Sequence, residues 1–382
     1  MPAIRLRRRQ TLAALALVAL TLAPSCTQYQ PFDSAAHLRN LYRQSAAGEA
    51  ADSIAVPFEL DGEVRGLLEE RYKPGPNELR RIEHVLDFIF RRVGLRYSLA
   101  PTRNAVETFR SREGNCLSFV NLFVGVARHQ RLSPFYVEVT DYQRWNYREG
   151  LVVSRGHIVA GMYVKGELKT YDFLPYRPKA YKDFKPIDDL TAAAHYYNNL
   201  GAEALMEGGL DRALGLLTTA HQIAPDFVKA INNLGVAYAR RGEVEKAVEI
   251  YRLGLEAEPR DVALLTNLAR AYQQLGRLEE ASVALSQIEG ANTSNPYFYL
   301  YQGELALARG DLEAALEHMA EALRRDSEVP EVHLGLVKVY LEAGDFERAR
   351  HHLSRALRLD ATNPEALRYA DLLAVSDRGR QP

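Results

Sequence analysis

The fold of the C-terminal half of this chain is decided by residues 228–261, which read VKAINNLGVAYARRGEVEKAVEIYRLGLEAEPRD. Two small residues of this stretch recur along the chain at a constant step of 34 residues. One set comprises Gly208, Gly242, Gly276, Gly310 and Gly344, and the other comprises Ala213, Ala247, Ala281, Ala315 and Ala349. Small residues let two helices pack closely, and glycine in the turn between them permits a positive φ. The stretch therefore predicts an array of helix pairs.

A period of 34 residues resembles the tetratricopeptide repeat, whose unit is a helix–turn–helix pair. Pro296, Pro330 and Pro364 keep the same period and suit the first position of a helix, where the missing N–H costs nothing. We expect an all-α solenoid over 194–376, made of five repeats and a capping helix. The resemblance implies that the solenoid binds a protein or peptide partner. The neighbouring tyrosines of the fourth repeat either line that binding surface or pack between the helices; they are Tyr297, Tyr299 and Tyr301.

The first 25 residues have the pattern of a secretory signal peptide, with four arginines before an apolar run over 12–22. That run is shorter than the roughly 20 residues that span a bilayer. Residues 22–26 read LAPSC and resemble the lipoprotein box of bacteria, although Ala23 stands where leucine is usual. The resemblance implies that Cys26 is lipidated and anchors the protein on the periplasmic face of the bacterial cell envelope. The resemblance to Gram-negative lipoproteins also implies sorting to the outer membrane, because Thr27 rather than Asp follows the cysteine.

The alternative is ordinary cleavage nearby, which would leave Cys26 as a spare thiol. Residues 26–56 contain the candidate lipidated cysteine and are rich in Ala, Ser and Gln. This composition is typical of a linker, and we expect it to tether the first folded domain to the anchor.

Composition and charge exclude several classes of protein. The 382 residues are 47% hydrophobic and 25% charged, which is a globular composition. Lys and Arg total 48 against 49 Asp and Glu, so the net charge of −1 predicts no nucleic-acid partner. Two cysteines are too few for a disulfide framework or a cysteine-rich zinc site.

No phosphate-binding or metal-binding motif is present in the sequence, so we expect no cofactor and no metal. His351 and His352 point to different sides of a helix and are expected at the surface.

Residues 57–187 have a different sequence pattern, which predicts helices in the first part and strands in the second. The pattern predicts helices at 77–94, 104–110 and 116–130, and strands at 135–141, 156–164 and 168–174. The helix over 116–130 is apolar on nearly every side, which is typical of a helix buried in the core.

Cys116 begins this buried helix, so its thiolate would face the positive end of the helix dipole. The alternative is a buried structural cysteine. His129 lies thirteen residues along the same helix, roughly 20 Å away, and cannot reach the thiol. His157 begins a strand, and a two-residue turn at 165–166 would place Asp172 on the same sheet face as His157.

The order Cys116, His157, Asp172 on a buried helix and two following strands resembles the transglutaminase-like cysteine hydrolase family. The resemblance covers about 130 residues and implies a papain-like α+β domain over 57–187. It implies that Cys116 is the nucleophile, His157 the general base and acid, and Asp172 the group that orients the imidazole. Asn104 is a candidate side-chain donor to the oxyanion, beside the backbone N–H of Cys116. Trp145 is a candidate for the border of the cleft, or an ordinary loop aromatic.

These features predict a membrane-anchored periplasmic enzyme that performs thiol acyl transfer on amide bonds, with a repeat domain that binds its partner. Hydrolysis, as in a peptidase or amidase, is favoured over transglutamination because water is abundant and nothing identifies an amine site. The alternative is a non-catalytic scaffold for envelope assembly, in which the repeats bind and the thiol domain is silent. The substrate and the oligomeric state stay open.

Overall fold

The computed structural model describes residues 36, 39, 40, 55–148, 151–174, 183–288 and 295–378. Within these ranges, the backbone alone is described over 140–148, 151–156 and 375–378. All of them belong to one of two units into which the chain divides, the unit of residues 34–382. Cys26 and most of the predicted linker lie outside the described residues.

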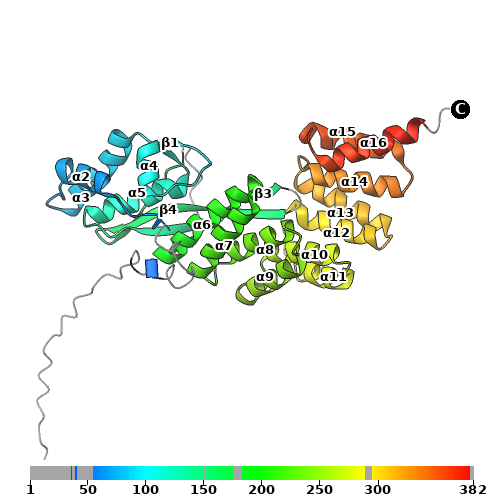
Figure 1. The fold of residues 1–382 in the computed structure, drawn as a ribbon, viewed down its shortest axis with the longest axis horizontal. Helices are drawn as coiled ribbons and strands as arrows, with labels where there is room; N and C mark the ends of the chain where they lie inside the picture. The colour runs from blue at the N-terminus through cyan, green and yellow to red at the C-terminus, as the bar shows by residue number, and fades with distance from the viewer. Residues whose placement is uncertain are drawn as a thin grey trace, which may run out of the picture. The chain divides into compact units, whose positions relative to one another are not determined.

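In the first part of the described chain the helices precede the four strands of the larger sheet, and two short strands, β1 and β2, lie between helices (Figure 1). The helices are α2 (Gly62–Arg71), α3 (Glu78–Leu86), the π-helix η2 (Asp87–Val93), α4 (Ala105–Ser111) and α5 (Cys116–His129). The strands are β1 (Arg96–Tyr97), β2 (Glu113–Gly114), β3 (Phe135–Arg148), β4 (Leu151–Val164), β5 (Glu167–Tyr171) and β6 (Phe184–Ile187). β1 and β2 form a parallel pair, and the other four strands form an antiparallel sheet in the order β5-β4-β3-β6. Sequence analysis did not predict α2 or β6.

The helix predicted over 77–94 changes its hydrogen-bond pattern midway. It is α-helical in α3, becomes the π-helix η2, and ends at Gly94, whose φ of 64° is the left-handed conformation that glycine adopts at no steric cost. The turn widens where Phe88, Ile89 and Val93 are buried against the core. A periodic apolar pattern therefore located the helix but not its internal irregularity.

The buried helix predicted over 116–130 is α5, and it packs against β4. Its apolar residues are fully buried because they share one core with alternate residues of the strand, Ile158, Ala160 and Met162. The Tyr136 hydroxyl, buried on β3, donates to Asn121 Oδ1 of α5 at 3.0 Å. Helix and sheet are thus joined by packing and by a satisfied buried polar contact.

The β4–β5 hairpin has the register that the two-residue turn predicts. Its turn residues, Lys165 and Gly166, have φ of 53° and 82°, as a tight hairpin turn requires. The strands pair Ala160 with Tyr171 and Met162 with Lys169. This register places Asp172 immediately after the last paired residue of β5, one strand away from His157.

The rest of the described chain is a succession of antiparallel helices (Figure 1). They are α6 (Asp189–Met206), α7 (Leu210–Ile223), α8 (Val228–Arg240), α9 (Val244–Ala257), α10 (Val262–Gln274), α11 (Leu278–Ser286), α12 (Pro296–Ala308), α13 (Leu312–Arg325), α14 (Pro330–Glu342), α15 (Phe346–Leu359) and α16 (Pro364–Arg378). The five glycines of the 34-residue period all have φ between 72° and 87°, and the five alanines are completely buried. Both features confirm the predicted helix pairs.

The first helix pair shares its core with the α+β part. Ala193, Tyr196 and Tyr197 of α6 belong to the same buried cluster as α5 and the sheet. The Tyr197 hydroxyl donates to the carbonyl oxygen of Ala55 at 2.7 Å. α6 begins at Asp189, five residues before the predicted start of the solenoid, so the first repeat is packed into the preceding domain.

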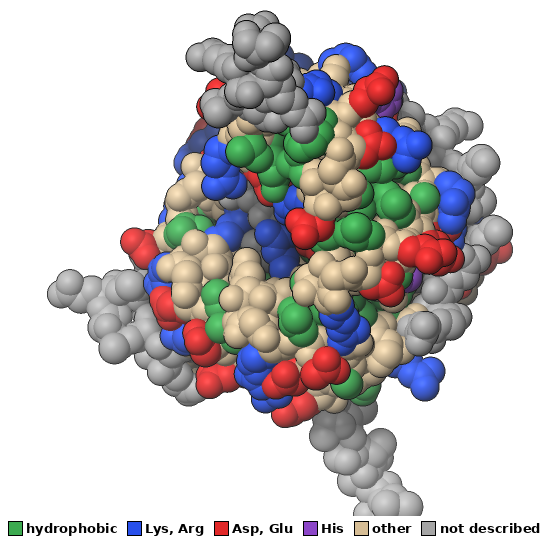
Figure 2. Space-filling view, turned by 90° about the vertical axis from the view of Figure 1, so that its right-hand side faces the viewer, with side chains coloured by type: hydrophobic (Ala, Val, Ile, Leu, Met, Phe, Trp, Pro, Cys, Tyr) green, Lys and Arg blue, Asp and Glu red, His purple; other side chains and the backbone are tan. Residues whose placement is uncertain are grey.

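The described surface carries charges of both signs. Figure 2 shows acidic and basic side chains interspersed over the face that it draws, around a hollow in which Lys or Arg side chains are visible. His352 differs from the surface position predicted for it, because its ring is partly buried and stacks on His333 and Tyr340. Within the described residues, no helix is both long enough and apolar enough to span a membrane.

Candidate active site

The turn before α5 places Cys116 at the first position of that helix. Asn115 is the N-cap, in an extended conformation, and its Oδ1 accepts a hydrogen bond from Ser118 N at 3.0 Å. Gly114 is required here, because a Cβ at this residue would lie 2.5 Å from Ser118 Cβ. Cys116 is a free, partly buried cysteine. The sequence Gly-Asn-Cys therefore sets a thiol at the positive end of a buried helix.

His157 and Asp172 are hydrogen-bonded to each other. His157 Nε2 lies 3.0 Å from Asp172 Oδ1, and the histidine is only 1% exposed. The carboxylate can only accept, so Nε2 carries the proton and the other ring nitrogen, Nδ1, is left for the thiol. Leu174 N donates to the same Asp172 oxygen at 3.0 Å, which holds the carboxylate in place.

The His157 side chain also hydrogen-bonds the Cys116 side chain, so the structure brings the three predicted residues together. Burial by itself lowers the pKa of His157. Hydrogen bonds to Asp172 and Cys116, with the negative charge of both partners, outweigh burial and raise this pKa from 6.5 to about 9. The imidazole is thereby held in its protonated form at neutral pH.

An irregularity in the sheet lies beside His157. β3 and β4 pair regularly up to Val139 and His157, and their register then shifts between Val139 and Arg144. A bulge of this kind bends the strand and redirects the neighbouring side chain. His157 thus begins the regular part of β4 that packs against α5, whereas Asp172 follows the end of β5.

Asn104, the candidate oxyanion donor, is the N-cap of α4. Its Oδ1 accepts from Glu107 N at 2.9 Å, the Glu107 carboxylate accepts from Asn104 N at 3.0 Å, and its side chain also hydrogen-bonds Tyr196. These contacts engage Asn104 in holding α4 to the first repeat helix. The oxyanion role stays a prediction, and the backbone N–H of Cys116 remains the other candidate donor.

Two further candidates cannot be placed. Cys26 lies outside the described residues, and Trp145 is on β3 where only the backbone is described. Among the described residues, no group of three or more His, Cys, Asp or Glu side chains is arranged to hold a metal ion.

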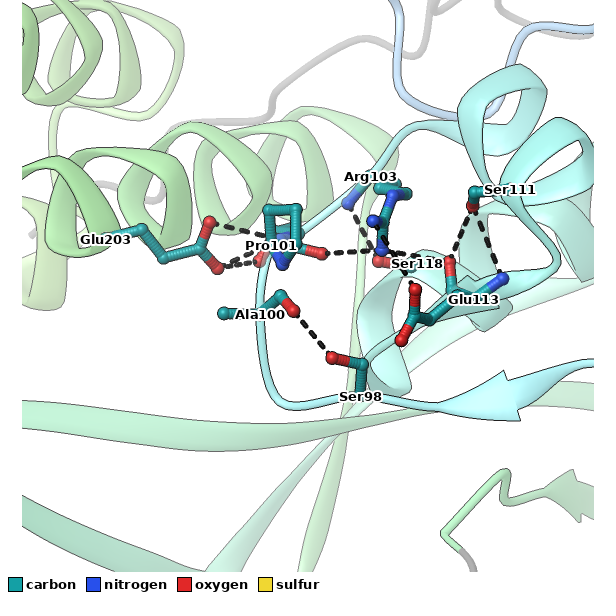
Figure 3. A network of polar contacts seen from close by, with 9 residues as sticks. Ser98, Ala100, Pro101, Arg103, Ser111, Glu113, Ser118 and Glu203 are labelled. Atoms are coloured by element: carbon teal, nitrogen blue, oxygen red, sulfur yellow. Dashed lines mark hydrogen bonds and ion pairs between the residues drawn. The ribbon is translucent and has the colours of Figure 1, made fainter.

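Sequence analysis missed a set of polar residues around the start of α5. Thr102, Arg103 and Ser118 form a hydrogen-bonded network with Glu203 of α6 (Figure 3). An N-cap residue at 115 has a local signal, since asparagine is favoured there. Glu203 has no such local signal, because it lies 101 residues from Thr102 in the sequence and contacts it only in the folded protein.

A second candidate site is a cavity of about 1250 Å³ beside the first repeats. Its lining includes Glu138 and Lys185 from the sheet and Lys229 from α8. Lys229 donates to the Glu138 carboxylate, which lies 3.7 Å from the buried His195. Burial and the charge of Lys229 lower the pKa of His195 to about 3, although Glu138 opposes them, so this imidazole is neutral. The cavity therefore offers charged groups of both signs next to a neutral histidine.

Comparison with known proteins confirms the repeats. Family models described as tetratricopeptide repeat match residues 204–264 and 306–375, and another of the same description matches residues 266–330. The curated proteins contain no match to this chain. Repeats of this kind are typical of scaffolds for protein–protein interaction.

Several solved structures are similar to about half of the chain. A tetratricopeptide repeat protein of Thermus thermophilus is 24% identical, with a TM-score of 0.44 over 48% of this chain and 100% of that one. Pseudomonas aeruginosa pilF is 23% identical, with a TM-score of 0.42 over 50% of this chain and 87% of that one. YrrB, described as a repeat protein with an unusual peptide-binding site, is 19% identical, with a TM-score of 0.34 over 47% of this chain and 92% of that one.

Proposed function

We propose that residues 57–187 form a transglutaminase-like domain with a papain-like fold, and that it performs thiol acyl transfer on an amide bond. One observation carries this proposal: His157 is hydrogen-bonded to both Cys116 and Asp172. A nucleophile, a base in contact with it and a third group that orients the base are the parts that nucleophilic catalysis requires.

At the start of the reaction, the proton of the Cys116 thiol has already moved to His157, so the nucleophile is a thiolate. Cys116 Sγ attacks the amide carbonyl carbon, and the backbone N–H groups at the start of α5 stabilise the oxyanion. The C–N bond breaks as His157 gives its proton to the departing amine nitrogen, leaving a thioester on Cys116. Water then gives a proton to His157 and attacks the thioester carbon, which releases the acid and returns the thiolate. The raised pKa of His157 favours the protonated state that the first half-reaction uses.

Water as the second substrate makes this enzyme a peptidase or amidase, whereas an amine would make it a transglutaminase. We favour hydrolysis because water needs no binding site. The repeats would supply the binding surface for a protein or peptide partner, and the charged cavity beside α8 is one place on it that is built to contact polar groups of either sign.

The rival function is a scaffold for envelope assembly with a silent thiol domain. The tetratricopeptide repeats favour it as strongly as they favour a substrate-binding role, since an extended repeat surface binds partners without catalysis. Reactivity of the thiol separates the two functions.

The decisive experiment is the pH dependence of Cys116 alkylation in the full chain carrying Cys26→Ser, so that Cys116 is the only thiol. In the proposed enzyme Cys116 is alkylated rapidly at neutral pH, and a His157→Ala variant reacts much more slowly there. His129→Ala is the matched control, because His129 lies at the far end of α5. Slow alkylation at neutral pH that His157→Ala leaves unchanged would favour the scaffold.

The membrane anchor is a separate proposal, resting on residues 22–26. We propose that Cys26 is acylated and holds the protein on the periplasmic side of the bacterial outer membrane, since more than one acyl chain anchors stably. Metabolic labelling with an alkynyl fatty acid in a Gram-negative host tests it. Label that persists in a Cys26→Ser variant, or a variant that stays in the membrane fraction, would contradict it.

A further inference from the structure

Glu203 of α6 holds the loop that precedes α4. Thr102 N donates to Glu203 Oε1 and Oε2 at 2.9 and 3.1 Å, and Thr102 Oγ1 donates to Oε1 at 2.7 Å. Thr102 is buried, so these bonds are shielded from water. A carboxylate that accepts from both donors of one residue fixes that residue in position and rotamer.

The contact continues to the N-cap of the nucleophile helix. Thr102 Oγ1 gives its only proton to Glu203, and its lone pair accepts from Asn115 Nδ2 at 2.7 Å. The other end of the same amide, Asn115 Oδ1, accepts from Ser118 N and from Ser118 Oγ, both at 3.0 Å. Every bond in this series has one donor and one acceptor, and no proton is used twice. One continuous series of hydrogen bonds therefore joins a repeat helix to the residue before Cys116.

A second arm closes the network (Figure 3). Ser118 Oγ, whose proton points to Asn115, accepts from Arg103 N at 2.8 Å. Arg103 Nη1 in turn donates to the carbonyl oxygen of Glu113 at 3.2 Å. Figure 3 shows Glu203 reaching from its helix toward the 100–103 loop, which lies beside Glu113 of β2. The loop, β2 and the first turn of α5 are thus held as one unit.

We propose that Glu203 is a positioning residue for the thiol site, acting through Thr102 on the N-cap Asn115. The inference rests on the proposed function, because it concerns the reactivity of Cys116. The N-cap bond decides where α5 begins and hence where the first-turn N–H groups point. Without Glu203, Thr102 N and Oγ1 lose their acceptor, and the Thr102 hydroxyl is no longer held where it accepts from Asn115 Nδ2. The N-cap then loses part of its support, and the thiolate loses part of its alignment with the helix start and with His157.

The test compares Cys116 alkylation across pH in full-chain Cys26→Ser protein and in its Glu203→Ala and Glu203→Gln variants. Glu203→Ala should lower the rate of alkylation at neutral pH roughly tenfold, which is the change expected from losing charge-assisted bonds that hold the N-cap. Glu203→Gln keeps the shape and one acceptor oxygen, so its profile should lie between the two. Glu207→Gln is the matched control, because Glu207 is one turn away, exposed, and contacts Arg212.

Thr102→Val provides a second variant should Glu203→Ala fail to fold, because it keeps the side-chain shape and removes the hydroxyl that links Glu203 to Asn115. A folded Glu203→Ala or Thr102→Val protein that is alkylated at the parent rate across pH would overturn the inference. The proposed function fails differently: the parent protein would then react slowly at neutral pH, and His157→Ala would not change its rate.

Discussion

Arg128 and Asp189 form a two-point ion pair that joins α5, the helix that begins at Cys116, to the first repeat helix α6. Arg128 Nη1 donates to Asp189 Oδ2 at 2.8 Å, and Nη2 donates to Oδ1 at 2.7 Å. The guanidinium also lies over the Phe58 ring, 4.8 Å from its centroid. Both side chains are partly buried, so the pair is shielded more than an ordinary surface pair. It is one of several contacts between the α+β part and the first repeats, beside those of Glu203 with Thr102, Tyr197 with Ala55 and Lys229 with Glu138.

Replacing Asp189 with Asn tests the contribution of this pair to stability. The variant keeps one acceptor but loses the charge, and we expect the free energy of unfolding to fall by about 1–2 kcal/mol. Urea unfolding followed by circular dichroism measures the change. The exposed pair of Arg80 and Glu83 is the control, since Glu83→Gln should change stability by less than about 0.5 kcal/mol. Equal effects of the two substitutions would mean that the α5–α6 pair contributes no more than a surface contact.

The features that could be predicted from the sequence are those that repeat or lie close together in it. Gly242 and Ala247 belong to a 34-residue period, and each unit makes the same turn and the same close contact. His157 and Asp172 are joined by a hairpin whose two-residue turn leaves one register, which is why their proximity was predictable.

The rest depends on contacts between distant segments. Thr102 and Glu203 lie 101 residues apart and belong to no period, so no local pattern marks them. α6 begins five residues before the predicted start of the solenoid, and its Asp189 pairs with Arg128 of α5, a contact that the repeat pattern does not mark. Asn104 is the opposite case, because its contact is local. It forms a capping box with Glu107, three residues along the chain, and this contact accounts for its position.

Replacing Asp172 with Asn should remove part of the pH dependence of stability. The pKa of His157 is raised in the folded protein to about 9, so its contribution is full below 6.5 and is lost as the pH rises through about 9. The side-chain amide of the variant would still accept from Leu174 N but would not stabilise the imidazolium. The parent protein should therefore exceed Asp172→Asn in stability at about pH 6 by more than it does at about pH 9.5, as measured by urea unfolding. A constant difference across this range would contradict the charge interaction between Asp172 and His157.

The turn glycines of the helix pairs should resist substitution more than a glycine inside a helix. Gly242 has a φ of 87°, so Gly242→Ala strains the backbone and should lower the free energy of unfolding by about 1–2 kcal/mol. Gly215 lies within α7, and a Cβ there would meet nothing within 4 Å. Gly215→Ala should therefore raise stability by roughly 0.5–1 kcal/mol. Urea unfolding of both variants checks the opposite signs, and a loss at Gly215 as large as at Gly242 would rule out backbone strain as the cause.

The histidines at the end of the solenoid should make its last repeats sensitive to acid. His333 Nδ1 lies 3.1 Å from His352 Nδ1, and His333 Nε2 lies 3.1 Å from the carbonyl oxygen of Ser327. A carbonyl can only accept, so neutral His333 carries its proton on Nε2 and accepts from His352 Nδ1–H. Burial, and next the proximity of His333, lower the pKa of His352 to about 4. The folded protein therefore binds fewer protons here than the unfolded chain does.

Because His352 binds a proton less readily in the folded protein than in the unfolded chain, acid favours unfolding at this site. The contribution of His352 is full above 6.5 and is lost as the pH falls through about 4, so acid should weaken the packing of the last repeats. His352→Phe keeps the stacking on Tyr340 and cannot be protonated, and it should retain more of its neutral-pH stability at about pH 4.5 than the parent does. His351→Phe is the matched control, because His351 is adjacent and exposed. Hydrogen exchange of α14 and α15 at both pH values measures the effect, and equal acid sensitivity in all three proteins would place its origin outside the His333–His352 contact.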